Sequence, residues 1–477
     1  MARALRSILP PAVASIAIAV LVGVVFGDGR LLNYDTSYSL LWGSQLADGQ
    51  VPDVQVPYAP TQHPLATLFG ALLALPGLGA SAPYGAGATT AWELFGLLCL
   101  GVLGWVVFAL GRAWFGVWAG VAAALIVLTR EPVLSFGVRA YVDIPYVCLL
   151  LGAVLAETRR PRSGTPVLVL LMFAGLLRPE AWLFSFAYAA YLRYHGDLRL
   201  SQVVWAVAAP VIWAFTDLIQ TGNPIYSFTE TQDAAEALGR ITGITNVPET
   251  LPRRLGEILR EPGLLAAGAG GVLSLALLRD RARIGAVSGL VAVGAFVVLA
   301  TAGLPILTRY LLGPGAILAI FAGAGLFGWQ QLEPGHRWRA RWIAISAVCA
   351  IAFAAFVPNQ IHRLERTNSA LADQRSILLE LRDLSPEAGA GCALSVPNRR
   401  PVPQLSLWTD RDPASFRSAQ EDKRYTLPAF SPANADAAKR FILNARDTVT
   451  YLPPTPRPAP GVQRIVGRWW VLTGRCP

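Results

Sequence analysis

The sequence predicts an α-helical polytopic membrane protein of about eleven transmembrane helices, followed by a small extracytoplasmic α/β domain. Three observations predict this fold: the composition, a series of apolar runs, and a change to a charged, proline-rich tail after Val357. Of the 477 residues, 54% are apolar and 15% are charged, whereas roughly 25% are charged in soluble chains. The net charge of +10 does not indicate nucleic acid as a partner, because the arginines stand at the ends of apolar runs.

The apolar runs have lengths near the roughly 20 residues that span a bilayer. The first follows a basic start without a cleavage site, so we expect it to be retained as a span. The runs cover residues 11–27, 88–111, 113–129, 141–157, 164–177, 180–195, 203–219, 263–278, 284–303, 309–328 and 341–357.

The arginines predict how the chain is oriented. If the amino terminus is cytoplasmic, every second connection is also cytoplasmic, and those connections carry the positive charges that the positive-inside rule requires. We therefore expect a multi-pass protein of the cell membrane, with its amino terminus in the cytoplasm and its carboxyl-terminal domain outside. The residues concerned are Arg3, Arg6, Arg112, Arg159, Arg160, Arg162, Arg193, Arg199, Arg279, Arg281, Arg283, Arg337, Arg339 and Arg341.

The predicted organisation is a transmembrane domain at residues 1–357 and an outer domain at 358–477. Two outer loops, 28–87 and 220–262, are long, and long loops between packed elements are usually functional. In the first loop, the apolar run from Pro64 to Leu78 predicts a re-entrant or interface-lying helix.

The tail contains one predicted helix and two predicted strands. Ile361, Leu364, Leu371, Leu378 and Leu381 have helical spacing, and the segments Cys392–Val396 and Arg468–Leu472 are typical of strands.

The five cysteines divide into two groups. Cys99, Cys148 and Cys349 lie in apolar runs and are expected to be small buried hydrophobic residues. Cys392 and Cys476 lie in the outer tail, where an oxidising compartment would allow a disulfide. Two unrelated free thiols are the alternative, since pairing cannot be deduced from sequence.

In the predicted topology, ionisable residues collect at the outer membrane edge, where their desolvation is costly and indicates function. They are Asp35, His63, Glu131, Arg139, Asp143, Arg178, Glu180 and Arg309. Asp35 could act as a general base beside the Tyr34 ring, which could help form a platform for a sugar. Its alternative role is to cap a helix through Tyr38 to Ala47.

Each of the other candidates also has two interpretations. Arg139 and Asp143 form either an ion pair one helical turn apart or contacts to substrate. Arg178 and Glu180 form either an internal salt bridge or part of a binding site. Arg309 either binds a phosphate or extends its charged group to the membrane interface.

His63 is expected to have a structural or substrate-contacting role, because a single histidine at this spacing is poor evidence for a metal ligand. No Walker loop, dinucleotide fingerprint, zinc motif or nucleophile elbow is present in the sequence. A nucleotide-driven pump is therefore not predicted. Nothing indicates a cofactor, although a divalent metal stays an open alternative.

The arrangement of these residues resembles the GT-C class of membrane glycosyltransferases, in particular the protein O-mannosyltransferase and aminoarabinose transferase group. The resemblance covers roughly residues 10 to 330. Many relatives carry two adjacent acids in the first outer loop, whereas here Thr36 follows Asp35, which leaves Asp35 as the one obvious base. The matching elements are Asp35, His63-Pro64-Leu65, Asp143-Ile144-Pro145, Arg178-Pro179-Glu180 and Arg309-Tyr310-Leu311.

The resemblance implies a GT-C-like fold and a donor in which a sugar of mannose or arabinose type is attached to polyprenyl phosphate. Asp35 would deprotonate an acceptor hydroxyl of a glycan, glycolipid or protein, with inversion at the anomeric carbon. Arg309, with Arg178, would stabilise the departing lipid phosphate. A lipid flippase or transporter, or a non-catalytic envelope assembly protein, would show a similar helix profile and is the alternative.

Overall fold

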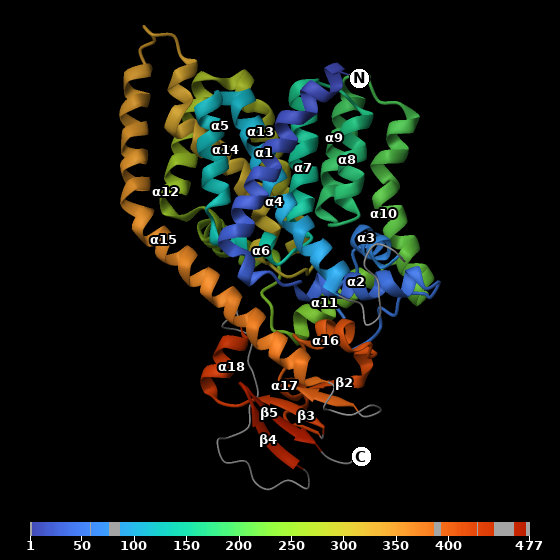
Figure 1. Ribbon diagram of the computed structural model, residues 1–477. Helices are drawn as coiled ribbons and strands as arrows, with labels where there is room; N and C mark the ends of the chain where they lie inside the picture. The colour runs from blue at the N-terminus through green and yellow to red at the C-terminus, as the bar shows by residue number, and fades with distance from the viewer. Residues whose placement is uncertain are drawn as a thin grey trace.

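A computed structural model describes residues 2–57, 59–75, 86–385, 393–426, 428–442 and 462–473. Figure 1 shows a bundle of helices stacked on a small α/β domain, with the amino terminus at the end of the bundle away from that domain. The predicted fold class, a helical membrane bundle with a small carboxyl-terminal α/β domain, is confirmed.

The bundle is built from helices that follow the predicted apolar runs. They are α1 (Ala2–Phe26), α4 (Ala86–Phe115), α5 (Val117–Leu128), α6 (Glu131–Val138), α7 (Asp143–Arg159), α8 (Thr165–Gly175), α9 (Glu180–Tyr194), α10 (Leu200–Thr221), α12 (Val247–Leu277), α13 (Arg279–Thr301), α14 (Leu312–Phe327) and the first part of α15 (Arg339–Leu384). Short helical turns lie at Gly27–Gly29, Ile244–Asn246, Thr308–Leu311 and Gly328–Gln331.

Within the part of the chain that the structure describes, 6 helices are long and apolar enough to cross a membrane, and the bent pair α5 and α6 could form a seventh span. The other predicted runs are also helical, but they are shorter or interrupted. One interruption is explained by the sequence: α12 breaks at Arg260, where φ is 62°. Pro262 follows two residues later, and a proline ring clashes with the carbonyl four residues earlier.

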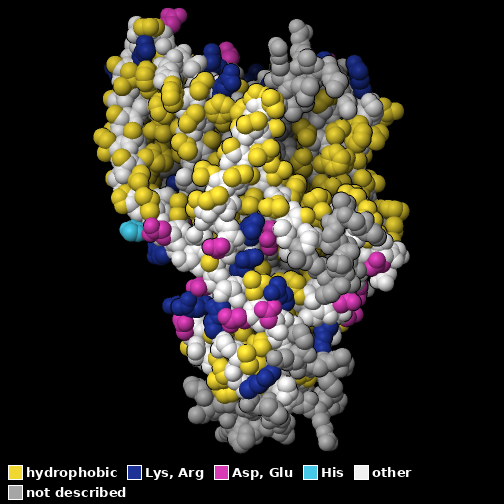
Figure 2. All heavy atoms as spheres, in the orientation of Figure 1, with side chains coloured by type: hydrophobic (Ala, Val, Ile, Leu, Met, Phe, Trp, Pro, Cys, Tyr) yellow, Lys and Arg dark blue, Asp and Glu magenta, His cyan; other side chains and the backbone are white. Residues whose placement is uncertain are grey.

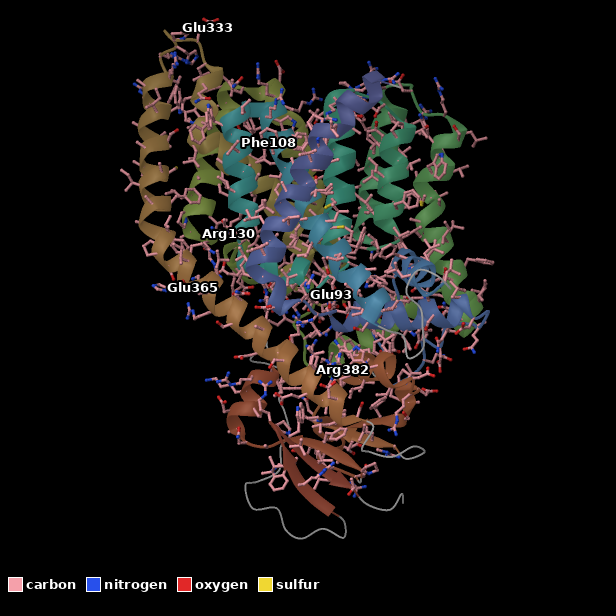
Figure 3. All side chains as sticks on the ribbon, viewed as in Figure 1. Glu93, Phe108, Arg130, Glu333, Glu365 and Arg382 are labelled. Atoms are coloured by element: carbon pink, nitrogen blue, oxygen red, sulfur yellow. The ribbon has the colours of Figure 1, made fainter. Side chains whose placement is uncertain are left out.

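Apolar side chains cover the sides of the bundle, and charged side chains gather at its ends (Figure 2). The predicted inner connections contact one another in the fold. Arg162 pairs with Asp197 at 2.9 Å, and Arg281 donates to the Gln331 side chain at 2.7 Å. Glu333 lies at this end of the molecule, and Arg382 lies beyond the other end of the bundle, where α15 meets the small domain (Figure 3).

Helix α15 joins the two parts of the molecule. Its 46 residues would extend about 69 Å at 1.5 Å per residue, roughly twice the hydrocarbon thickness of a bilayer. The predicted helix through Ile361 to Leu381 is confirmed as the second half of α15, and the helix continues through Val357 without a break. The chain therefore passes from the bundle to the small domain along one helix.

The small domain packs a five-stranded sheet against the end of α15. The strand order is β2-β1-β3-β5-β4, with β1 parallel to β2 and β3, and β5 antiparallel to β3 and β4. Trp469 and Val471 are buried together with Ile377 and Leu381, and the Trp469 indole donates to the Ile377 carbonyl at 3.1 Å. The elements are β1 (Leu394–Val396), α16 (Val402–Thr409), the turn Pro413–Ser415, β2 (Phe416–Ser418), α17 (Ala419–Asp422), β3 (Ala429–Pro432), α18 (Ala435–Phe441), β4 (Val462–Val466) and β5 (Trp469–Thr473).

Both strand predictions match the sheet, since β1 and β5 lie in the predicted segments. Cys99, Cys148 and Cys349 are buried free cysteines, as expected. Cys392 and Cys476 lie outside the described residues.

Three further helices lie between the bundle and the small domain: α2 (Tyr34–Ala47), α3 (Pro64–Ala74) and α11 (Tyr226–Ala237) (Figure 1). Helix α3 is the described part of the helix predicted from Pro64. A Cβ at Gly43 would lie 2.4 Å from the Gly70 and Ala71 backbones, so α2 and α3 pack at close approach through small residues. The Gln404 side chain of α16 donates to the Leu32 carbonyl at 2.8 Å, which attaches the small domain to the start of α2.

Candidate functional site

The start of α2 places Asp35 at the junction of the bundle and the small domain. Asn33 is the N-cap, and its side chain accepts hydrogen bonds from the backbone N–H groups of Asp35 at 2.8 Å and Thr36 at 3.3 Å. The alternative that Asp35 caps this helix is therefore wrong, because Asn33 already satisfies the free N–H groups. The Asp35 carboxylate is left available for other contacts.

The turn before α7 holds the start of α2 in place. The Arg139 carbonyl accepts from the Asn33 backbone N–H at 3.0 Å, and the Ala140 carbonyl accepts from the Thr36 hydroxyl at 2.8 Å. Ala140 has a φ of 52°, which turns the chain sharply before Asp143 begins α7. The backbone of this turn therefore positions Asp35. The sequence had instead predicted side chains at this turn, those of Arg139 and Asp143, as site residues.

Asp35 forms an ion pair with Arg309, which the fold brings from the turn before α14. Arg309 Nη1 lies 2.6 Å from Asp35 Oδ2. Burial alone would raise the pKa of the Asp35 carboxyl, but Arg309, His63 and Arg240 outweigh it and lower that pKa to about 2. Asp35 is therefore a carboxylate at neutral pH, which a general base must be.

Arg178 lies at the centre of a second, more deeply buried group. Its Nη1 is 2.5 Å from Asp143 Oδ1, and its Nη2 and Nε are 2.7 Å and 3.0 Å from Glu180 Oε1. One guanidinium group thus donates hydrogen bonds to two carboxylates. The second oxygen of each carboxylate, Asp143 Oδ2 and Glu180 Oε2, has no hydrogen-bond partner among the described residues. The predicted internal salt bridge between Arg178 and Glu180 is present.

Tyr310 connects the two ion-pair groups. The Arg178 Cζ lies 4.1 Å from the centre of the Tyr310 ring, and the Arg309 Cζ lies 5.7 Å from it. Two guanidinium groups therefore share one aromatic ring, an arrangement that attracts each cation to the ring and holds them near one another. The result is a pair of neighbouring arginines, of which Arg309 is bound to Asp35 and Arg178 to Asp143 and Glu180.

His63 lies close to the same groups. It is buried, its ring centre is 6.1 Å from that of Trp213, and it interacts electrostatically with Asp35 and Arg178. The N–H of Leu65, two residues on, donates to the Leu176 carbonyl at 3.2 Å, which places the start of α3 beside the Arg178 turn. Burial lowers the pKa of His63 to about 4, so the ring is neutral at physiological pH.

Two expectations about site residues were wrong. Arg139 does not pair with Asp143; its Nη1 instead donates to the Tyr141 hydroxyl at 3.3 Å, because Arg139 precedes the sharp turn and lies outside α7. Tyr34 does not offer an open platform to a sugar. Its ring is only 9% exposed and packs against Tyr38 at 5.2 Å between ring centres.

Glu131 belongs to a different cluster. It lies 3.0 Å from Arg260, at the break in α12, and accepts from the Gln360 side chain of α15 at 3.1 Å. Its neighbour Arg130 lies within the bundle (Figure 3). Glu131 therefore helps to join α6, α12 and α15, and none of its contacts within the described residues is with Asp35.

The sequence interpretation missed several residues of the site. Asn33 could have been recognised, because asparagine is a favoured N-cap residue. Arg240 could not, since it lies in an irregular segment of the long connection 220–262 and belongs to no motif. The adjacent arginines of that connection, Arg253 and Arg254, bond locally to Glu257. Over the described residues, no group of three His, Cys, Asp or Glu side chains could hold a metal ion.

The sequence matches no family model and no curated protein. Among solved structures, the chain is similar to ArnT from Cupriavidus metallidurans bound to undecaprenyl phosphate, with a TM-score of 0.55 and 15% identity, over 96% of this chain and 97% of that one. It is also similar to ArnT from the same organism in the apo state, with a TM-score of 0.52 and 16% identity over 84% of each chain. The expected GT-C-like fold is therefore confirmed as the fold of ArnT, an aminoarabinose transferase.

Proposed function

We propose that this protein transfers a sugar from polyprenyl phosphate to an acceptor hydroxyl at the outer face of the cell membrane. The observation that carries the proposal is the contact of 2.6 Å between Asp35 and Arg309. It places a carboxylate base beside a guanidinium that suits a phosphate, at one end of a membrane bundle. Support also comes from the fold, since ArnT was crystallised with undecaprenyl phosphate bound.

Asp35 and Arg309 would act in sequence. When the donor phosphate binds Arg309, it takes part of the charge that holds down the pKa of Asp35, so the carboxylate becomes a stronger base as the donor arrives. Asp35 then accepts the proton of the acceptor hydroxyl, and that oxygen attacks the anomeric carbon from the face opposite the phosphate. The bond from the anomeric carbon to the phosphate oxygen breaks, configuration inverts, and polyprenyl phosphate leaves on Arg309.

The other buried groups would organise this reaction. Arg178, held by Asp143 and Glu180, fixes Tyr310 and through it the position of Arg309. His63 is buried and neutral, and it interacts electrostatically with Asp35 and Arg309. It would help to exclude water and so strengthen the interaction between donor phosphate and guanidinium. The reaction needs no nucleotide sugar, because the donor arrives through the lipid phase.

In the proposed orientation, the amino terminus is cytoplasmic, and Asp35, Arg309 and the small domain lie outside. The arginine-rich connections predicted to be cytoplasmic contact each other at the far end of the bundle, as the pairs of Arg162 with Asp197 and Arg281 with Gln331 indicate. The donor sugar would be of mannose or arabinose type, and the acceptor a glycan, a glycolipid or a protein.

The test is sugar transfer by the purified protein from radiolabelled polyprenyl-phosphate mannose and polyprenyl-phosphate arabinose, with an envelope extract as acceptor. We expect Asp35→Asn to lower kcat by about 10² to 10⁴, the usual contribution of a general base, while donor binding is retained. Asp53→Asn is the matched control, because Asp53 is an exposed acid of the same outer loop. Transport of the lipid across vesicles without any transfer would instead establish a flippase.

A further inference from the structure

Two broken helical segments meet beside α15, and the reaction described above uses no residue of this region. Helices α5 and α6 are bent by 67° at the break that contains Arg130, and α12 breaks at Arg260. Helix α6 contacts both α12 and α15. Figure 3 labels Arg130 within the bundle and Glu365 where α15 leaves the bundle. Broken helices at membrane depth are tolerated where protein or a cavity surrounds them, and they often mark a binding site.

Glu131, the first residue of α6, connects both breaks to α15. Its Oε1 lies 3.0 Å from Arg260 Nη2 and 3.9 Å from Arg363 Nη1. Its Oε2 accepts a hydrogen bond from Gln360 Nε2 at 3.1 Å. Arg363 Nε donates to Asn359 Oδ1 at 3.3 Å. A single carboxylate thus interacts with arginines of two helices, and the longer contact holds Arg363 more weakly than Arg260.

A groove opens between α12 and α15 next to Glu131. Its volume is about 510 Å³, and Leu265 of α12, which is 50% exposed, opens it to the side of the bundle. On α15, the apolar Ala352 and Phe356 line it first, and the polar Asn359 and Arg363 follow in the direction of the small domain. The lining therefore changes from apolar to polar along the groove, as a lipid does from its acyl chain to its head group.

The arginines of this region are not fully paired. Arg130 is only 5% exposed, and its Nε and Nη1 have no hydrogen-bond partner among the described residues, which is also true of Arg260 Nε. Arg130 lines a separate cavity of about 10 Å³, too small for more than one water molecule, so it acts on the groove through its charge. Glu261, the other acid of the groove, is exposed and forms no ion pair with these arginines in the described parts of the chain. Arg130, Arg260 and Arg363 therefore share Glu131, and the region favours an anion.

We propose that this groove binds one anionic phospholipid from the membrane leaflet on the side of the small domain. An acyl chain lies along the apolar part of the groove, and the phosphate pairs with Arg363 and Arg260, because arginine suits phosphate oxygens. Glu131 keeps its hydrogen bond from Gln360 and the nearby charge of Arg130 when the phosphate binds. The lipid then bridges the break in α12 to α15, the helix that carries the small domain, and this site does not depend on the proposed reaction.

The experiment measures lipid binding to the purified full-length protein in detergent by native mass spectrometry. Dioleoylphosphatidylglycerol is the anionic probe, and dioleoylphosphatidylcholine has the same chains with a zwitterionic head group. We expect one phosphatidylglycerol per chain to bind about tenfold or more tightly than phosphatidylcholine, and Arg363→Gln to weaken that binding about tenfold or more, as for a lost hydrogen bond to a charged group. Ala352→Phe fills the groove without changing any charge and should weaken binding of phosphatidylglycerol as well.

Arg366→Gln is the matched control, because Arg366 is an exposed arginine of α15 that does not line the groove, and its variant should bind phosphatidylglycerol as wild type does. Equal affinity for the two lipids, or unchanged binding in Arg363→Gln or in Ala352→Phe, would overturn the proposal. An equal loss in Arg366→Gln would also overturn it, because the attraction would then come from general surface charge. Displacement of phosphatidylglycerol by an equal concentration of undecaprenyl phosphate would assign the groove to the donor lipid instead.

Discussion

The two ion-pair groups around Tyr310 differ in burial and in charge balance. In the Arg178 group, one cation faces two carboxylates, and the side chains are 0% to 5% exposed. In the Asp35 group, one cation faces one carboxylate, and the side chains are 14% and 19% exposed. The first group is closed to solvent, whereas the second keeps some exposure, as the proposed exchange of one partner for a phosphate requires.

This difference indicates a division of roles. A buried cation with two carboxylates is costly to disturb, because removing it leaves uncompensated buried charge. A partly exposed pair contributes less to stability, and it can open at a lower cost when a competing anion arrives. We therefore infer that the Arg178 group maintains the structure of the site and that the Asp35 group performs its chemistry.

Replacing the central cation of the buried group is the strongest test of this division. We expect Arg178→Met to destabilise the protein by about 3 to 5 kcal/mol, the usual cost of breaking a buried ion pair. Arg309→Met should cost less, about 1 to 2 kcal/mol, because its pair with Asp35 keeps some solvent exposure. Thermal unfolding in detergent measures both, and equal losses in the two variants would remove the distinction.

The pH dependence of stability tests whether the region around both groups excludes water. The unfolded chain protonates His63 near its usual pKa of 6.5, whereas the folded protein protonates it only near 4. The unfolded state thus binds more protons in this interval, and stability falls as pH decreases from about 6.5 to 4, by about 3 kcal/mol in all. Unfolding temperatures of wild type and His63→Gln from pH 7 to 4 should diverge in slope, and parallel curves would show that His63 is solvated.

Affinity for the lipid phosphate tests whether Arg309, and not Arg178, binds the donor. Arg309→Gln should weaken undecaprenyl phosphate binding by about 10-fold to 100-fold, since hydrogen bonds to charged groups contribute about 1.5 to 3 kcal/mol. Arg253→Gln removes a mostly exposed arginine of the second outer loop and serves as the control. Unchanged affinity in Arg309→Gln would assign the donor phosphate to other residues.

The cap of α2 gives the smallest expected effect. Asn33→Ala should cost about 1 kcal/mol in stability and should also lower transfer activity, because the cap orients Asp35. Ser418 caps α17 in the small domain, so Ser418→Ala should lower stability by a similar amount without changing activity. Equal activity in the two variants would show that the start of α2 does not position the base.

The amino-acid sequence by itself determined the local features of this protein. Apolar runs determined the helices, because each helix satisfies its own backbone hydrogen bonds and needs only an apolar surface in lipid. Close spacing also determined the contact of Arg178 with Glu180, which are two residues apart. The candidate residues Asp35, His63, Asp143, Arg178, Glu180 and Arg309 were all found from the sequence.

Only the tertiary structure decided how those residues pair. Asp143 contacts Arg178, 35 residues away, and not Arg139, four residues away. The four-residue rule holds only inside a helix, and the positive φ of Ala140 places Arg139 before the helix begins.

The long-range contacts are decided in the same way. Asp35 and Arg309 are 274 residues apart, and Arg240 interacts with both of them from an irregular segment that carries no periodic signal. Helix formation depends on neighbours along the chain and can be read from the sequence. The charge balance of the site depends on which helix ends and turns meet, and that is determined by the packing of the bundle and by the docking of the small domain.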